Sequence, residues 1–180
     1  LELHSGKLLW KRQHISEPLV SLKPTKARDG VADQHAQSSL GPEHGAQQFQ
    51  QGPAGASTYT PLTIDAKRGA VYATTAEEYG FSGAAGPYSV IGYDLKTGVQ
   101  LWQQSLLPGD AERSRICSSR ETDCRNFFST GTSALLYGLS ADSDLLIVGQ
   151  KSGKVHALDP DHSGKIRWST QVADGGDLGG

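Results

Sequence analysis

The sequence predicts an all-β chain built from repeated four-stranded sheets, and three observations lead to this fold class. The 180 residues include 22 Gly and 8 Pro, no Met and only 20% charged residues, a composition typical of chains rich in tight turns. A short segment that contains a Gly and then a Trp occurs three times. Apolar runs separated by polar turns precede the second and third copies. Together these features indicate strands joined by turns rather than helices.

The repeated segment has an apolar residue, a polar turn, Ser or Thr followed by Gly, and then a Trp. Its three copies are LELHSGKLLWKRQ (1–13), GYDLKTGVQLWQQ (92–104) and ALDPDHSGKIRWST (157–170). We interpret each copy as a β-hairpin in which the glycine (Gly6, Gly98 or Gly164) adopts a positive φ, and the following strand delivers its Trp to a buried seam. A hairpin alone cannot bury that Trp, so neighbouring units must stack.

Two more strands are expected before the second Trp, and another two before the third. Residues 61–75 and 132–150 contain apolar runs separated by the turns DAKRG and LSADSD. The total is four strands in roughly forty residues, the pattern of a β-propeller blade. We therefore expect blades at 61–104 and 132–172 and the end of a preceding blade at 1–13. A propeller needs about four blades to close, so residues 1–180 are predicted to be a fragment of one propeller domain.

Two segments interrupt the repeat. Residues 16–52 are rich in Gln, Ala, Ser, Gly and Pro without a sustained period and are expected to form a long inter-blade loop. Residues 107–131 form a second loop, which carries Cys117 and Cys124. These cysteines would close a small ring in an oxidising compartment, with two free thiols as an equal alternative and a zinc pair less expected. Long loops on a rigid scaffold are frequent places for function.

The charge pattern argues against some classes of partner. The chain has 17 Lys and Arg against 19 Asp and Glu, and no basic run that could neutralise several phosphates at once. Nucleic acid is therefore not an expected partner. The sequence also contains no apolar run long enough to cross a bilayer and no signal-peptide pattern in its first residues.

Several stretches carry a resemblance to a known family. The runs YDLKTGVQLW and LDPDHSGKIRW resemble the repeat of propellers that bind pyrroloquinoline quinone (PQQ). Among these, the runs GPAGASTYTPLTIDAKRGAVYATT, LLPGDAE and DLLIVGQKSGKVHALDP are most similar to quinoprotein alcohol dehydrogenases of the polyvinyl-alcohol dehydrogenase type. The repeat alone is also similar to that of non-catalytic propeller scaffolds of bacterial outer-membrane assembly.

The resemblance implies a fragment of a PQQ-dependent alcohol dehydrogenase. Such an enzyme oxidises a small or polymeric alcohol to a carbonyl, passes hydride to the quinone and sends electrons to a cytochrome c. It also implies calcium as a second cofactor and a periplasmic or extracellular location. The alternative is a non-catalytic PQQ-repeat propeller that acts as a protein-interaction scaffold.

The resemblance also assigns site residues. Lys151 matches the cation near the quinone oxygens, where a positive charge stabilises the negative charge that develops on reduction. Tyr59 stands at the position of the Trp that stacks on the quinone, and Glu77, beside Glu78, stands at the position of a calcium-binding Asn. The alternatives are a solvated hairpin lysine, a core or loop aromatic, and a pair of solvated turn glutamates.

The catalytic base has no clear counterpart. The chain reads PGDAER where the family has PGDAWN, so Glu112 and Arg113 replace Trp and Asn. The acidic run that follows in the family is replaced by NFFSTGTS. Asp110 and Glu112 are candidates only through their nearness in sequence, because a general base must lie within hydrogen-bond reach of the alcohol proton.

Overall fold

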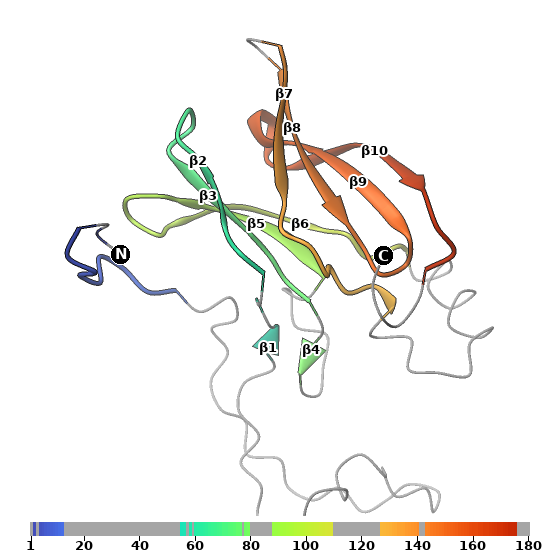
Figure 1. Ribbon diagram of the computed structural model, residues 1–180, viewed down its shortest axis with the longest axis horizontal. Helices are drawn as coiled ribbons and strands as arrows, with labels where there is room; N and C mark the ends of the chain where they lie inside the picture. Colours follow the sequence, from blue (N-terminus) through green and yellow to red (C-terminus); the bar gives the residue numbers. More distant parts are fainter. Residues whose placement is uncertain are drawn as a thin grey trace, which may run out of the picture.

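The computed structural model places two four-stranded antiparallel sheets side by side (Figure 1), which confirms the predicted all-β class. The residues that it describes are 2, 4–12, 55–56, 58, 60–76, 78–79, 88–109, 127–140 and 143–175. The described part of the chain contains no helix with the length and hydropathy that a bilayer crossing requires.

The first sheet has the strand order β2-β3-β5-β6. Its strands are β2 (Thr63–Asp65), β3 (Ala70–Thr74), β5 (Ser89–Asp94) and β6 (Gln100–Ser105). All of β3 is buried, and β5 is buried except at its last residue, because these central strands are covered on both faces. Between β3 and β5 the chain forms β4 (Glu78–Tyr79), which pairs with β1 (Gly55–Ala56) in a small separate sheet.

The second sheet is a meander in which each strand pairs with the next along the chain. Its strands are β7 (Leu135–Ser140), β8 (Ser143–Gly149), β9 (Lys154–Asp159) and β10 (Lys165–Gln171). A short 3₁₀ helix, η2 (Pro160–His162), connects β9 to β10, and the Asp159 carboxylate caps it by accepting a hydrogen bond from the Asp161 N–H at 3.0 Å.

The main hydrophobic core lies between the two sheets. One cross-strand row of the second sheet supplies part of it, because the paired residues of neighbouring strands lie on the same face. That row is Leu136, Leu146, Leu158 and Ile166. The first sheet supplies Ala70, Tyr72 and Val90, and the ring of Tyr72 lies 5.5 Å from the ring of Trp102.

The repeated glycine and Trp form contacts between successive units. Gly6, Gly98 and Gly164 have φ values of 67°, 68° and 71°, as the sequence predicted. The Trp102 ring covers Gly164 of the next unit so closely that a Cβ there would lie 2.4 Å from the ring. Trp10 covers Gly98 in the same way, at 2.5 Å. Trp10 and Trp102 therefore each pack on the turn of the following unit and not on the turn of their own unit.

Trp168 departs from the expected burial, because 45% of its surface is exposed. It pairs across the sheet with Ala157, on the face of the second sheet that points away from the first sheet. The described residues provide no further turn to cover that face. The prediction of a buried seam is therefore correct for Trp10 and Trp102, which are partly buried, and wrong for Trp168 within this chain.

Candidate functional site

Lys151 lies in the tight turn between β8 and β9. This turn and the small β1–β4 sheet are at the same end of the molecule, opposite the β2–β3 and β7–β8 turns (Figure 1). Backbone hydrogen bonds close the turn: the Gln150 N–H donates to Lys154 O, and the Gly153 N–H donates to Gln150 O, both at 2.9 Å. Gly153 has a φ of 78°, and a Cβ there would lie 2.1 Å from Ala173 O, so the turn requires glycine.

The segment of residues 127–134 holds this turn in place. The Lys151 N–H donates to Ser129 O at 2.9 Å. The Gln150 side chain, which is 5% exposed, donates through Nε2 to Phe128 O at 2.9 Å and accepts a hydrogen bond from the Ser152 hydroxyl at 2.6 Å. The backbone at Lys151 is therefore fixed by a buried polar network, whereas a solvated hairpin needs no such support.

The same segment is joined to the end of β3. The Thr130 hydroxyl donates to Thr75 O at 2.6 Å, and the Thr74 hydroxyl donates to Thr132 O at 2.9 Å. Thr75 and Thr130 are almost fully buried, so these bonds are protected from water. A continuous series of contacts thus links the Lys151 backbone to Thr75, two residues before Glu77.

Most of the other sequence-predicted site residues lie outside the described part of the chain. These are Tyr59, Glu77, Asp110, Glu112, Cys117 and Cys124. The roles assigned to them, like the role assigned to Lys151, remain predictions. The structure brings the end of β3 together with the Lys151 turn, and these are the places where the resemblance puts a metal ligand and a quinone-facing cation.

Sequence reasoning missed the residues that connect these two places. In the sequence, the NFFSTGTS run indicates only the loss of an acidic segment. In the structure, the carbonyls of Ser129 and Thr132 and the hydroxyl of Thr130 form the hydrogen bonds described above. The signal that could have found them is the density of Ser and Thr next to an apolar strand. Such hydroxyls satisfy backbone groups where two sheets meet without a shared ladder.

A metal centre cannot be assembled from the described residues. Among them there is no group of three or more His, Cys, Asp or Glu side chains that could hold an ion. Calcium takes six to eight oxygen ligands as a rule. A calcium site would therefore need Glu77 and other residues that lie outside the described ranges.

Comparison with known proteins gives matches over nearly the whole chain. The family PQQ_2, described as outer membrane protein assembly factor BamB, matches residues 1–177. A polyvinylalcohol dehydrogenase from Pseudomonas sp is 31% identical over 184 aligned positions, which cover 100% of this chain and 26% of that protein. A polyvinylalcohol dehydrogenase from Sphingopyxis sp. (strain 113P3) is 28% identical over 186 positions, with the same coverage.

The chain therefore spans about a quarter of the length of these curated relatives. Among solved structures, BamB from Moraxella catarrhalis aligns with a TM-score of 0.28 and 16% identity. That alignment covers 63% of this chain and 37% of the other.

Proposed function

This chain belongs to the PQQ-repeat family described as outer membrane protein assembly factor BamB, and from this premise we propose that it is part of a PQQ-dependent alcohol dehydrogenase. The identity of 31% with a polyvinylalcohol dehydrogenase along the whole chain supports the dehydrogenase branch of the family. The observation that carries the proposal is the placement of Lys151: its turn is tied through Ser129 and Thr130 to the end of β3.

Lys151 has the chemistry that a quinone site requires. PQQ, when bound, supplies an electrophilic quinone that takes hydride from the alcohol carbon and leaves a carbonyl product. An ammonium group beside a quinone oxygen stabilises the charge that develops there, most effectively when the protein holds it in place before the reaction. The half-buried position of Lys151 and its hydrogen-bonded backbone support this role.

The remaining roles are proposed by resemblance. Tyr59 would stack on the planar cofactor, and Glu77 would supply a hard oxygen ligand to calcium. Asp110 and Glu112 are the candidates for the base that removes the alcohol proton, and neither is assigned. Electrons would leave to a cytochrome c, in a periplasmic or extracellular setting where a Cys117–Cys124 disulfide could form.

A second function is favoured by a specific departure from the dehydrogenase pattern. Glu112 and Arg113 replace the Trp and Asn of the family loop, so the region expected to carry the base is altered. The matching family is described as an outer membrane protein assembly factor. The second candidate is therefore a non-catalytic propeller that binds other proteins.

Cofactor binding separates the two functions. The protein, in the full length in which its organism makes it, would be mixed with PQQ and calcium, and quinone absorbance and dye reduction with alcohols would be measured. We expect Lys151→Met to weaken quinone binding at least tenfold and Lys151→Arg to retain most of it, because Arg keeps the charge.

Lys96→Met is the matched control, because Lys96 is exposed in the β5–β6 turn of the other sheet. It should leave quinone binding unchanged. Absence of quinone binding in the unmodified protein would refute the dehydrogenase and favour the scaffold. Equal losses in Lys151→Met and Lys96→Met would refute the role of Lys151.

A further inference from the structure

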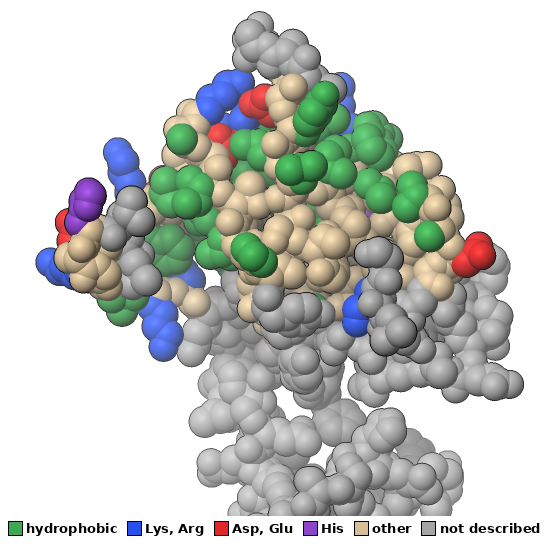
Figure 2. Space-filling view, in the orientation of Figure 1, with side chains coloured by type: hydrophobic (Ala, Val, Ile, Leu, Met, Phe, Trp, Pro, Cys, Tyr) green, Lys and Arg blue, Asp and Glu red, His purple; other side chains and the backbone are tan. Residues whose placement is uncertain are grey.

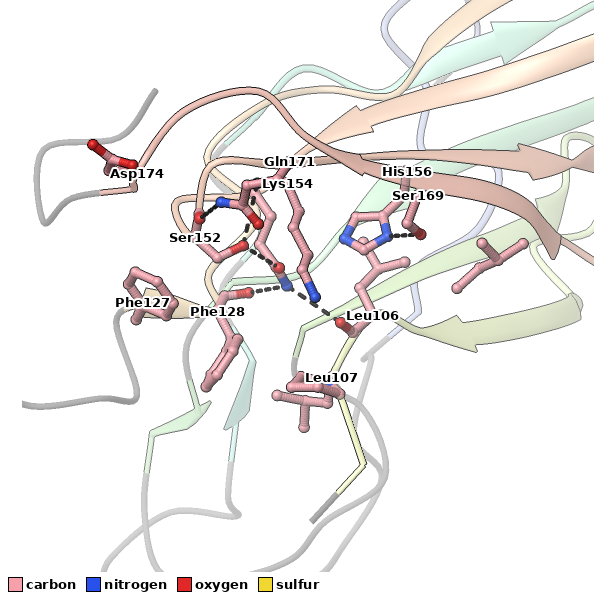
Figure 3. Close-up of a pocket in the computed structure, with 13 residues that line it drawn as sticks. Leu106, Leu107, Phe127, Phe128, Ser152, Lys154, His156, Ser169, Gln171 and Asp174 are labelled. Atoms are coloured by element: carbon pink, nitrogen blue, oxygen red, sulfur yellow. Dashed lines mark hydrogen bonds between the residues drawn. The ribbon is translucent and has the colours of Figure 1, made fainter. Parts of the chain in front are cut away.

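A pocket of about 260 Å³ lies between the two sheets, beyond the end of β6 (Figure 3). Its walls are largely apolar, from Leu106, Leu107, Phe127, Phe128 and Ile166. Its polar lining includes Lys154 and His156 from β9 and Ser169 and Gln171 from β10. Lys151 is not among the described residues that line it, so this pocket is distinct from the surroundings of the proposed quinone-facing cation.

His156 has an unsatisfied nitrogen in this pocket. The residue is 5% exposed, and its Nδ1 forms a hydrogen bond of 2.8 Å with the Ser169 hydroxyl. Its Nε2 is buried and has no hydrogen-bond partner. Figure 3 shows the ring with Nδ1 turned to Ser169 and Nε2 on the opposite edge, toward Lys154. A buried polar group without a partner destabilises the folded state, so this atom favours a ligand that satisfies it.

The positively charged side chain of Lys154 lies on the same face of β9 as His156. Lys154 precedes His156 by two residues on β9, so both side chains project from the same face of the sheet. Burial, and then the charge of Lys154, lower the pKa of His156, so the imidazole is neutral at pH 7. The other charged residue that lines the pocket in the described chain is Asp174, which is exposed and lies at the far end of the pocket from His156 in Figure 3.

Two amide side chains of the pocket are engaged by backbone carbonyls. The Gln171 Nε2 donates to Ser152 O and to Ala173 O, both at 2.6 Å. The Gln150 Nε2 donates to Phe128 O. An ammonium group has three donors, so Lys154 can engage a ligand together with the His156 Nε2. Lys154 and His156 thus supply a charged donor and a ring nitrogen to a pocket that is otherwise lined largely by apolar side chains.

We propose that this pocket binds a small organic carboxylate with an apolar body, held by Lys154 and His156. A carboxylate oxygen accepts hydrogen bonds, so binding it favours the tautomer in which the Ser169 hydroxyl donates to Nδ1 and the imidazole proton is on Nε2. Lys154 supplies the opposite charge, and the Leu and Phe side chains cover the apolar body. A cavity of about 150 Å³ already accommodates benzene, so a pocket of this size accommodates an aryl carboxylate.

Isothermal titration of the full-length protein with benzoate tests this site, with benzyl alcohol as a neutral probe of similar shape. We expect benzoate to bind at least tenfold more tightly than benzyl alcohol. Binding should strengthen at least threefold between pH 8 and pH 5.5, because a bound anion raises the pKa of His156 and is coupled to proton uptake. Titration in buffers of different ionisation enthalpy measures that uptake directly.

Substitutions inside and outside the pocket test where benzoate binds. His156→Gln and Lys154→Met should each weaken benzoate binding at least tenfold. His162→Gln and Lys165→Met should not, because both residues are exposed near the β9–β10 turn and neither lines the pocket. If His156→Gln does not fold, Lys154→Met and the proton uptake of the unmodified protein still decide the question.

Three results would overturn the proposal: no benzoate binding, equal binding of benzoate and benzyl alcohol, or unchanged binding in folded His156→Gln and Lys154→Met. None of these measurements uses the quinone, so failure here leaves the proposed dehydrogenase untouched.

Discussion

Gly164 and Trp102 show how single residues connect one sheet to the next. Gly164 has a positive φ, and the Trp102 ring lies where its Cβ would be. Gly92, the cross-strand partner of Trp102, also lies under the indole, and a Cβ at Gly92 would lie 2.7 Å from the ring. The ring thus fills a space that two glycines leave open, one in its own sheet and one in the neighbouring turn.

Gly164→Ala should destabilise the protein far more than Gly69→Ala. Both glycines have positive φ, but nothing lies within 4 Å of a Cβ at Gly69. A left-handed alanine costs about 1–2 kcal/mol, and overpacking against Trp102 adds about 1–3 kcal/mol at Gly164 only. Urea unfolding of the two variants measures the difference. Equal losses would show that the Trp102 contact does not contribute.

At the scale of secondary-structure elements, Arg68 connects three turns by forming ion pairs with their carboxylates. It lies in the β2–β3 turn and pairs with Asp65 at 2.9 Å, with Asp144 at 2.8 Å and with Asp161 at 2.5 Å. Asp65 is 1% exposed and also accepts a hydrogen bond from the Tyr72 hydroxyl at 2.9 Å. Asp144 and Asp161 belong to the second sheet and to η2, so this guanidinium joins the two sheets at the end opposite Lys151.

Arg68→Met should cost about 3 kcal/mol of unfolding free energy, because it leaves the buried Asp65 carboxylate without its cation. Lys67→Met is the matched control, since Lys67 is half exposed and its ion pair is with Asp144, a carboxylate that is not fully buried. It should have a much smaller effect. Chemical denaturation of both variants provides the comparison, and a loss in Lys67→Met as large as that in Arg68→Met would contradict the proposed role of Arg68.

The same cluster should make stability depend on acid pH. Hydrogen bonds from Arg68 are the main cause that lowers the pKa of Asp144 and of Asp161. For Asp65, burial raises the pKa, but hydrogen bonds from Arg68 and Tyr72 outweigh it and the net shift is downward. Carboxylates with lowered pKa stabilise the fold above their unfolded values, near 3.8, and lose that contribution as pH falls through the folded values.

We therefore expect the midpoint of thermal unfolding to fall between pH 5 and pH 2 in the unmodified protein. The fall should be shallower in Arg68→Met, where the pKa values of these carboxylates return toward their ordinary values. Parallel pH profiles for the two proteins would show that other groups dominate acid unfolding.

At the scale of the whole molecule, the second sheet has one covered face and one open apolar face. The open face contains the cross-strand row Leu135, Ile147, Ala157 and Trp168. Leu135 is 61% exposed and Tyr137, on the same face, is 54% exposed. Apolar side chains gather over β7 and β8 in the space-filling view (Figure 2). On the first sheet, Trp10 and Leu95 cover the corresponding face. Among the described residues, no such side chains cover the open face of the second sheet.

We expect Trp168 to be covered in the full-length protein by the turn of a following unit, as Trp102 is covered by Gly164. Hydroxyl-radical footprinting with mass spectrometry measures this exposure residue by residue. Trp168 should be oxidised as slowly as Trp102. Fast oxidation of Trp168 beside slow oxidation of Trp102 would mean that no further unit packs on this face.

Much of the fold was predictable because strand and turn signals are local. The glycines that adopt positive φ, the alternation that places Leu136 and Leu146 on one face, and the tight turn at Lys151 all follow from neighbouring residues. The site was less predictable. Ser129 and Thr130 were not identified, because the Ser129 carbonyl and the Thr130 hydroxyl bond to Lys151 N–H and Thr75 O, which are far from them along the chain.

The sequence by itself determined the strands, their turns and the repeat, since these depend on residues that are close along the chain. Only the tertiary structure decided which turn each Trp covers, which sheet face becomes core, and that His156 has a buried Nε2 without a partner. These outcomes depend on contacts between residues far apart in sequence. The indole of Trp10, for example, donates to the carbonyl of Leu95, 85 positions away.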